Sequence, residues 1–208
     1  GGSASATTTT AAGTGGGGEG GSGQGGSLPT PVVRFVALGD AGKGNQGQLD
    51  VANAVAAKCA LDGCDFVQIL GDNIYDSGVS SVNDPQWQTK FEVPYAGVSE
   101  EFWVVLGNHD YGGDGAGNEF SKGQHEIDYT GISTKWKLPS AYYHRTIQHV
   151  EFFALDTNMA MYYQAGQQTT DVATWMAQST ATWRIAFGHH PYLSNGPHGN
   201  AGSYEGLP

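Results

Sequence analysis

The sequence predicts a layered α/β domain that follows a flexible leader. Short apolar runs alternate with segments in which apolar residues recur at helical spacing, as expected for strands and helices that follow one another along a chain. Four of the apolar runs end at a short polar motif. A chain of 208 residues is long enough for one domain with a sizeable core.

The leader is set apart by its composition. Residues 1–26 contain only Gly, Ser, Ala, Thr, Glu and Gln. Burial of these small and polar side chains cannot offset the entropy cost of ordering the backbone. We therefore expect residues 1–27 to be a Gly/Ser/Thr-rich disordered linker and residues 28–208 to form the domain.

The first half of the domain reads as strand, helix, strand and strand. Residues 32–38 predict a continuous buried strand, and residues 46–58 predict a helix that packs one face on the sheet. Residues 66–70 and 102–106 are the next apolar runs. The Gly-rich stretch 111–117 is expected to be a mobile loop over the site.

The second half repeats the alternation with different connections. Residues 141–147 and 149–155 predict a hairpin or two adjacent strands. Residues 170–180 carry apolar side chains at helical spacing, and residues 183–187 form another apolar run. The pattern is therefore that of a layered α/β fold.

The charge of the chain limits its partners. Nine Lys and Arg residues stand against 20 Asp and Glu, which gives a formal net charge of -11. Nucleic acids and anionic membranes need a basic face, so neither is expected as the main partner. No apolar run approaches the roughly 20 residues that span a bilayer, so no transmembrane segment is predicted.

The two cysteines, Cys59 and Cys64, lie at a predicted turn from helix to strand. They could form one disulfide in a small loop or remain free thiols, whereas a thiol-metal site would need more Cys or nearby His. Together with the Gly-rich leader, a disulfide favours an extracytoplasmic location, as a secreted, periplasmic or surface lipoprotein.

Polar motifs stand at the ends of four predicted strands. The motifs are Gly39-Asp40, Gly71-Asp72-Asn73-Ile74-Tyr75, Gly107-Asn108-His109-Asp110 and Gly188-His189-His190. α/β proteins place their sites beyond the carboxyl ends of strands, and Asp, Tyr, Asn and His are ligands suited to paired metal ions. Each residue alone has an ordinary explanation as a turn, cap or core-edge residue. Four strand ends in this order favour a joint metal site.

These motifs resemble the signature blocks of the calcineurin-like metallophosphoesterases. Tyr75 narrows the resemblance to the purple acid phosphatases, particularly the small tartrate-resistant type. Further similarity lies in residues 35–40, 136–143 and 154–157, and the resemblance runs from about Val32 to about His198. It implies the αββα sandwich of that family.

The resemblance also implies a dinuclear metal centre. Asp40, Asp72 and Tyr75 would hold Fe(III), and a phenolate suits such a strongly Lewis-acidic ion. Asp72 would bridge to a divalent iron, zinc or manganese ion held by Asn108 and His189.

Further residues acquire roles through the same resemblance. His109 is similar to the family histidine that contacts the substrate phosphate beside Asn108, with Asp110 as the group that orients it. A histidine merely tied to Asp110 is the alternative for His109. His198 is similar to the proton donor for the leaving group, although a surface-loop histidine is nearly as compatible with its surroundings. The histidines that match no ligand block are expected to be surface or packing residues: His125, His144, His149 and His190.

One departure from the family pattern affects the ligand set. The last block of the family, Gly-His-x-His, supplies one imidazole to each metal and has no counterpart after His198. We expect a fragment or truncated sequence that lacks the C-terminal part of the sandwich, because half a site is rarely useful. The alternative is a natural short protein with weakened metal binding.

The implied function is that of an acid phosphatase. The resemblance implies hydrolysis of small-molecule or protein phosphate monoesters by a hydroxide bound to both metals. A monomer is expected, although no pattern in the sequence determines the oligomeric state. One alternative is a phosphodiesterase or nucleotide hydrolase on the same scaffold. Another is a secreted binding module that has lost catalysis.

Overall fold

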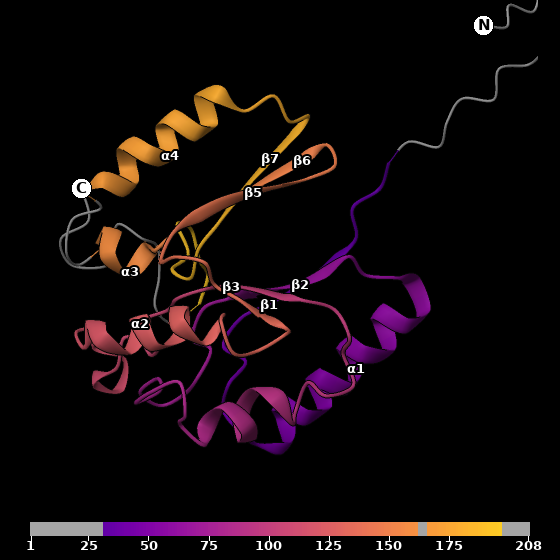
Figure 1. Ribbon diagram of the computed structural model, residues 1–208, viewed down its shortest axis with the longest axis vertical. Helices are drawn as coiled ribbons and strands as arrows, with labels where there is room; N and C mark the ends of the chain where they lie inside the picture. The colour runs from indigo at the N-terminus through magenta and orange to yellow at the C-terminus, as the bar shows by residue number, and fades with distance from the viewer. Residues whose placement is uncertain (1–30, 162–165, 197–208) are drawn as a thin grey trace, which may run out of the picture. The chain divides into compact units, whose positions relative to one another are not determined.

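The computed structural model describes residues 31–161 and 166–196, and these residues contain two sheets (Figure 1). Four parallel strands form the first sheet in the order β1-β2-β3-β4, and three strands form the second in the order β5-β6-β7. The strands are β1 (Phe35–Leu38), β2 (Phe66–Leu70), β3 (Phe102–Val105), β4 (Trp136–Lys137), β5 (Tyr143–Ile147), β6 (Val150–Ala154) and β7 (Trp183–Phe187).

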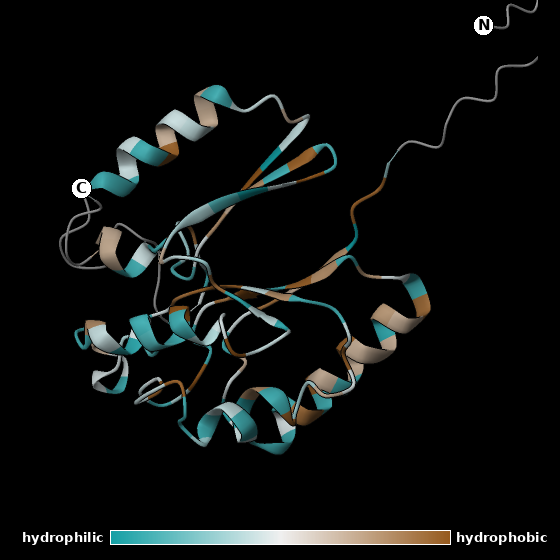
Figure 2. Cartoon of the chain, viewed as in Figure 1, coloured by the Kyte–Doolittle hydropathy of each residue, from teal (hydrophilic) through white to brown (hydrophobic). Residues whose placement is uncertain are grey.

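The first sheet is covered by the helix that joins its first two strands. α1 (Gln46–Asp62) buries Ala52, Val55 and Cys59 in the same core as the residues of β2 and β3. Asn45 caps the helix, because its side chain accepts a hydrogen bond from Gln48 N. Figure 2 shows that hydrophobic residues concentrate in α1 and in the strands of this sheet.

The second sheet faces the first across aromatic side chains. Phe152 of β6 meets the rings of Phe35 and Phe66 edge-on at centroid distances of 5.4 and 5.3 Å. α4 (Gln167–Gln178) lies on the outer side of this sheet, opposite the side of the molecule that carries α1 (Figure 1). The order of layers is helix, sheet, sheet, helix, which confirms the layered α/β prediction.

Several elements differ from the sequence prediction. β1 begins at Phe35 rather than residue 32, because it pairs with β2 only from that residue onward. It is also half-exposed rather than continuously buried, since it lies at the edge of the sheet. α1 extends to Asp62, and the prediction missed the short elements η1 (Gln88–Glu92), η2 (Gly113–Gly115), α2 (Phe120–Tyr129), α3 (Thr157–Met159) and β4.

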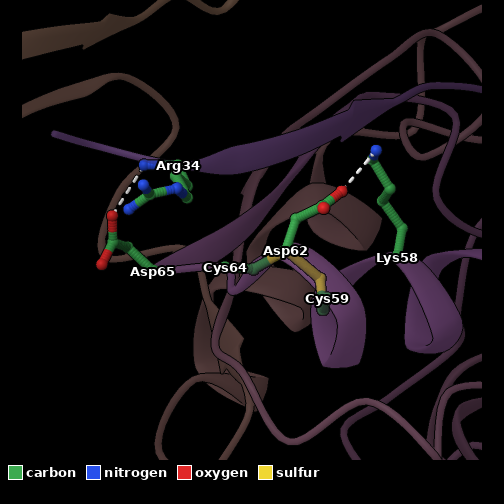
Figure 3. The surroundings of a disulfide bond; sticks show 6 residues. All are labelled: Arg34, Lys58, Cys59, Asp62, Cys64 and Asp65. Atoms are coloured by element: carbon green, nitrogen blue, oxygen red, sulfur yellow. Dashed lines mark hydrogen bonds and ion pairs between the residues drawn. A yellow bond between two sulfur atoms is a disulfide. The ribbon is translucent and has the colours of Figure 1, made fainter.

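Cys59 and Cys64 form a disulfide, which settles the choice between a bridge and free thiols (Figure 3). Their Cα atoms are 4.9 Å apart, within the usual range for a bridge. The bond spans the end of α1, where Gly63 adopts a φ of 76° that a residue with a side chain would adopt only under strain. It ties the helix to the segment that enters β2.

Among residues 31–161 and 166–196, no helix has the length and apolar character needed to cross a bilayer.

Candidate metal centre

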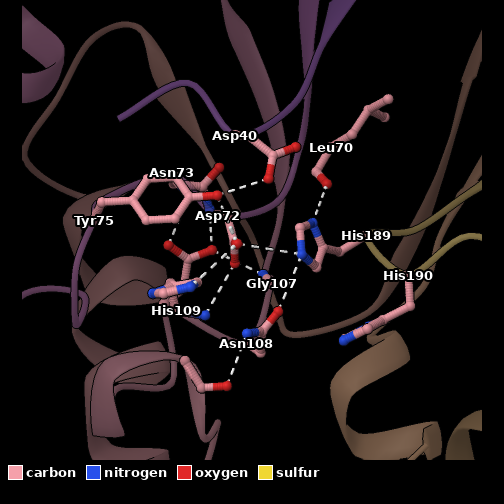
Figure 4. A network of polar contacts seen from close by, with 12 residues as sticks. Asp40, Leu70, Asp72, Asn73, Tyr75, Gly107, Asn108, His109, His189 and His190 are labelled. Atoms are coloured by element: carbon pink, nitrogen blue, oxygen red, sulfur yellow. Dashed lines mark hydrogen bonds and ion pairs between the residues drawn. The ribbon is translucent and has the colours of Figure 1, made fainter. Parts of the chain in front are cut away.

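The ends of β1, β2, β3 and β7 meet around one cavity of about 550 Å³ (Figure 4). The first three strands are parallel, so the residues that follow them emerge at one edge of the first sheet. β7 reaches the same place from the second sheet. The residues that line the cavity are Asp40, Asp72, Tyr75, Asn108, His109, Gly115, His189, His190, Pro191, Ser194 and Gly196.

Two carboxylates and a phenol form one side of the cavity. The Oη atom of Tyr75 donates to Asp40 Oδ1 at 2.6 Å and lies 2.8 Å from Asp72 Oδ2. Asp40 and Asp72 have φ values of 56° and 52°, in the left-handed region that residues with a Cβ rarely adopt. Such conformations cost on the order of 1–3 kcal/mol each and cluster at functional sites. Both aspartates are therefore held in a strained backbone by the surrounding fold.

The backbone of the third motif approaches Asp72 closely. A Cβ atom on Gly107 would stand 2.2 Å from Asp72 Oδ1, so only glycine fits this position. The next turn of the loop brings the N–H of His109 to Asp72 Oδ1 at 2.9 Å. One oxygen of Asp72 is thereby fixed by the backbone, and the other faces the cavity.

His189 directs its Nε2 atom into the cavity. Its Nδ1 lies 2.9 Å from Leu70 O, and because a carbonyl only accepts, Nδ1 carries the proton. Nε2 then faces Asn108 Oδ1 at 3.1 Å and Asp72 Oδ2 at 3.4 Å. The amide nitrogen of Asn108 donates to Gly115 O at 2.8 Å, which turns its oxygen inward.

The donor set fits a metal ion. Ligand atoms of Asp40, Asp72 and His189 lie within 4.8 Å of one another. The Nε2 atom of His189 faces the oxygen acceptors of Asn108 and Asp72, an arrangement that requires either a proton or a metal cation between them. Hard oxygen atoms with one imidazole suit a Lewis-acidic ion.

The pKa values of His189 and Tyr75 reflect the negative charge of the neighbouring carboxylates. Burial alone would lower the pKa of His189, but the hydrogen bond and charge of Asp72 raise it to about 9. Burial, reinforced by hydrogen bonds to Asp40 and Asp72, raises the pKa of Tyr75 above its ordinary value. A bound cation would reverse both effects, because it favours imidazole and phenolate as ligands.

A buried polar network supports the floor of the cavity. Asp110 accepts hydrogen bonds from the backbone N–H groups of Asn73, Ile74 and Gly107 at 2.7, 3.1 and 2.8 Å. The side-chain nitrogen of Asn73 lies 2.9 Å from Asp110 Oδ2 and 3.1 Å from Glu126 Oε2. Burial raises the pKa of Asp110 to about 7, and burial also raises that of Glu126 well above its ordinary range. The network locks the loops that carry Asp72 and Asn108.

The structure corrects the expected role of Asp110. We expected this carboxylate to orient His109, but it holds backbone N–H groups of both ligand loops instead. The ring of His109 is oriented by Asp76, whose carbonyl oxygen lies 2.5 Å from His109 Nδ1. His109 therefore presents Nε2 toward the cavity, 4.0 Å from Asp72 Oδ2.

Other histidines fall into three groups. His190, expected to be a surface or packing residue, lines the cavity. His125, His144 and His149 do not line it, and His144 pairs with Glu151 at 2.7 Å. His198 lies outside the described residues, so its role as a proton donor remains a prediction.

Three supporting residues received no role from the sequence. Asn73 and Glu126 belong to the buried network, and Thr157 Oγ1 accepts from the N–H groups of His189 and His190 at 3.2 and 3.1 Å. The same hydroxyl lies 2.9 Å from His190 Nδ1, to which it can donate. The only available signal was position, because Asn73 and Thr157 lie just beyond the ends of strands.

Comparison with known proteins decides the family. The model of the calcineurin-like phosphoesterase family matches residues 33–207. The chain belongs to the calcineurin-like phosphoesterases. Within this family it is similar to mouse tartrate-resistant acid phosphatase type 5, with 31% identity over 206 residues that cover 84% of the chain and 60% of the mouse protein.

Other relatives extend the comparison across the family. Purple acid phosphatase 3 of Arabidopsis thaliana is 32% identical over 187 residues, which cover 81% of the chain and 50% of that protein. A solved structure described as GAP50, the anchor in the inner membrane complex of Plasmodium, has a TM-score of 0.64 and 25% identity, and the match covers 81% of the chain and 58% of GAP50. The chain thus spans about 60% of the length of the mouse enzyme.

The family assignment confirms the resemblance and the metallophosphoesterase fold. The relatives are purple and tartrate-resistant acid phosphatases, whose chemistry implies a dinuclear metal centre. The carboxylates, phenol and imidazole of this chain stand together beyond the ends of β1, β2 and β7.

Proposed function

We propose that this protein hydrolyses phosphate monoesters with the help of two metal ions. The observation that supports this most is the placement of Asp72, one carboxylate that faces Tyr75 Oη and His189 Nε2 with the same oxygen. A carboxylate between two ligand groups can bridge a pair of ions.

The ligand residues divide into two groups in this proposal. Asp40, Asp72 and Tyr75 would hold Fe(III), and Asp72, Asn108 and His189 would hold a divalent iron, zinc or manganese ion. When bound, the two metal ions would activate a water molecule as the nucleophile and offset negative charge on the phosphate. The phenol of Tyr75 must lose its proton to bind, and both neighbouring carboxylates oppose this until a cation is present.

His109 is proposed to bind the phosphate. Its Nδ1–H is fixed on the carbonyl oxygen of Asp76, so Nε2 is the atom that can meet a substrate oxygen in the cavity. A protonated Nε2 would stabilise negative charge that develops on the phosphate oxygens. His198 remains the proposed proton donor to the leaving alkoxide.

A second candidate function is binding without turnover. GAP50 is described as an anchor in the inner membrane complex of Plasmodium, so a solved structure similar to this chain carries a description that names no hydrolase. This likeness keeps a non-catalytic binding module as the alternative. A phosphodiesterase on the same scaffold is the other alternative. The protein is also proposed to be a monomer that lies outside the cytoplasm.

The test is turnover of matched esters by protein reconstituted with Fe(III) and Zn(II). The proposal expects an aryl monoester to be hydrolysed faster than the matching diester. His109→Gln should lower kcat/KM by about 10²- to 10³-fold, the usual effect of losing one donor to developing charge. His125→Gln is the matched control and should leave the rate unchanged, because His125 does not line the cavity.

Each alternative predicts a different result. A preference for the diester would favour a phosphodiesterase. Full metal content without turnover of either ester would favour the binding module. Equal losses in His109→Gln and His125→Gln would contradict the proposed role of His109.

A further inference from the structure

Residues 75–78, which we call the tyrosine segment, are held in place by side chains rather than by a sheet or a helix. Each of their four consecutive carbonyl oxygens accepts a hydrogen bond from a side chain elsewhere in the chain. The donors are Lys90 Nζ to Tyr75 O, His109 Nδ1 to Asp76 O at 2.5 Å, Lys122 Nζ to Ser77 O at 2.6 Å, and Gln86 Nε2 to Gly78 O at 3.1 Å. Carbonyl groups in proteins are usually paired by backbone, so this segment depends on its side-chain donors.

Positive charge concentrates on this segment. Lys43 pairs with the carboxylate of Asp76, so three of the nine basic residues of the chain contact residues 75–77. The chain carries a net charge of -11, which makes that concentration unusual. Two of the three lysines, Lys90 and Lys122, donate to neutral carbonyl oxygens instead of forming an ion pair with the segment.

Lys90 is itself fixed on two sides. Its Nζ also donates to Gln86 Oε1 at 2.7 Å, and its carbonyl oxygen accepts from Gln48 Nε2 at 2.5 Å. Gln48 is buried, with 6% of its surface exposed, and its Oε1 accepts from Gly44 N at 2.6 Å. A chain of contacts therefore runs from the start of α1 through Lys90 to the carbonyl of Tyr75.

Lys122 is fixed by a second contact of its own. Its ammonium group lies 3.3 Å from Glu119 Oε2, and only 22% of its side chain is exposed. The other oxygen of Glu119 accepts from Gly113 N at 2.9 Å. α2 is thereby linked to both the tyrosine segment and the loop that ends at Gly115.

The tyrosine segment determines where two groups of the cavity lie. Tyr75 Oη can reach Asp40 and Asp72 only while the main chain of Tyr75 keeps its present position. The ring of His109 is oriented by the carbonyl oxygen of Asp76. We propose that Lys90 and Lys122 are positioning residues that set the placement of Tyr75 and His109 by binding the carbonyls on either side of Asp76. The role of Tyr75 as a metal ligand rests on the proposed function, whereas the hold on the segment does not.

The first test uses metal-free protein and amide hydrogen exchange. The reporters are the N–H groups of Tyr75 and Gly78, which donate to Gly42 O and Ile74 O at 3.0 and 2.9 Å. Lys90→Met and Lys122→Met should each speed exchange in residues 72–78 by about tenfold, because a hydrogen bond from a charged group is lost. Exchange in β6 should stay within about twofold of wild type, and Lys90→Arg should restore most of the protection.

The matched control is Lys58→Met. Lys58 pairs with Asp62 on the exposed surface of α1, so this variant also removes one ammonium group and one contact (Figure 3). Its exchange in residues 72–78 should equal that of wild type. Unchanged exchange in Lys90→Met and Lys122→Met would overturn the proposal, and so would an equal increase in β6, which marks general destabilisation.

The second test uses protein loaded with Fe(III). If Tyr75 binds the ion, Lys90→Met should shift or weaken the visible absorption of the iron-phenolate pair, and Lys58→Met should not. An identical spectrum in Lys90→Met would overturn the placement of Tyr75 by Lys90. Iron-loaded wild type without this absorption would contradict the proposed iron site instead, and the exchange result would still decide the role of the lysines.

Discussion

β2 and β7 are both short, mainly apolar strands, but they have very different surroundings. Each is a five-residue apolar strand that ends just before a proposed metal ligand. β2 lies between β1 and β3, with Val67 fully buried, whereas β7 pairs with β6 alone among the described strands and leaves Trp183 61% exposed. An apolar run therefore predicts a strand but not whether that strand is central or at an edge.

The ligands that follow these strands are supported unequally. Asp72 follows β2 and is fixed by the N–H of His109, by Tyr75 and by the buried network around Asn73. His189 follows β7 and is fixed by Leu70 O and by Thr157. Asp72 is thus surrounded by a buried network of supporting residues, whereas the imidazole and backbone of His189 are held outside the cavity by one carbonyl oxygen and one hydroxyl.

The largest expected effect comes from the ligand shared by both proposed ions. Asp72→Asn removes the charge of the proposed bridge, so the protein should lose both bound ions. Asn108→Ala removes a ligand of one ion and should cost at most that ion. Elemental analysis of matched samples measures the difference, and equal losses would argue against a bridge.

Paired substitutions in the two strands test the contrast in burial. Phe66 of β2 is 1% exposed, so Phe66→Ala should lower the free energy of unfolding by about 3–5 kcal/mol. Trp183→Ala in β7 should lower it by less than about 1 kcal/mol, because most of that side chain already meets water. Urea unfolding of both variants measures the two costs, and similar values would show that β7 is as buried as β2.

The smallest expected effect concerns the support of His189. Thr157→Val removes the hydroxyl that accepts from two backbone N–H groups, and should cost about 1–2 kcal/mol of stability. It should also weaken metal binding by about tenfold through displacement of His189. Thr174→Val is the control, because Thr174 is exposed and its hydroxyl donates to Thr170 O within α4, and it should cost under about 0.5 kcal/mol. Unchanged metal affinity in Thr157→Val would show that Thr157 does not position the ligand.

Much of the fold could be predicted because the spacing of apolar residues along the chain follows which side chains are buried. The run 66–70 and the apolar spacing of α1 identified their elements, and the motifs at strand ends identified the ligand loops. α2 was missed because it buries few large apolar side chains, Tyr129 among them. β4 was missed because two residues carry no periodic signal.

The supports of the site could not be predicted for a different reason. Lys90 and Lys122 act on backbone carbonyls, which are present at every residue and leave no pattern in the sequence. The contacts of Glu126 and Thr157 join segments far apart in the chain. Such contacts follow from the packing of layers rather than from local residue order.

The most direct test of the metal centre is the colour of iron-loaded protein with and without the phenol of Tyr75. Tyr75→Phe removes only the oxygen that faces Asp40 and Asp72, so the fold should persist. The proposal predicts visible absorption from an iron-phenolate pair in wild type and its loss in Tyr75→Phe. A Tyr75→Phe protein that keeps the colour, or a wild type that binds Fe(III) without colour, would contradict it.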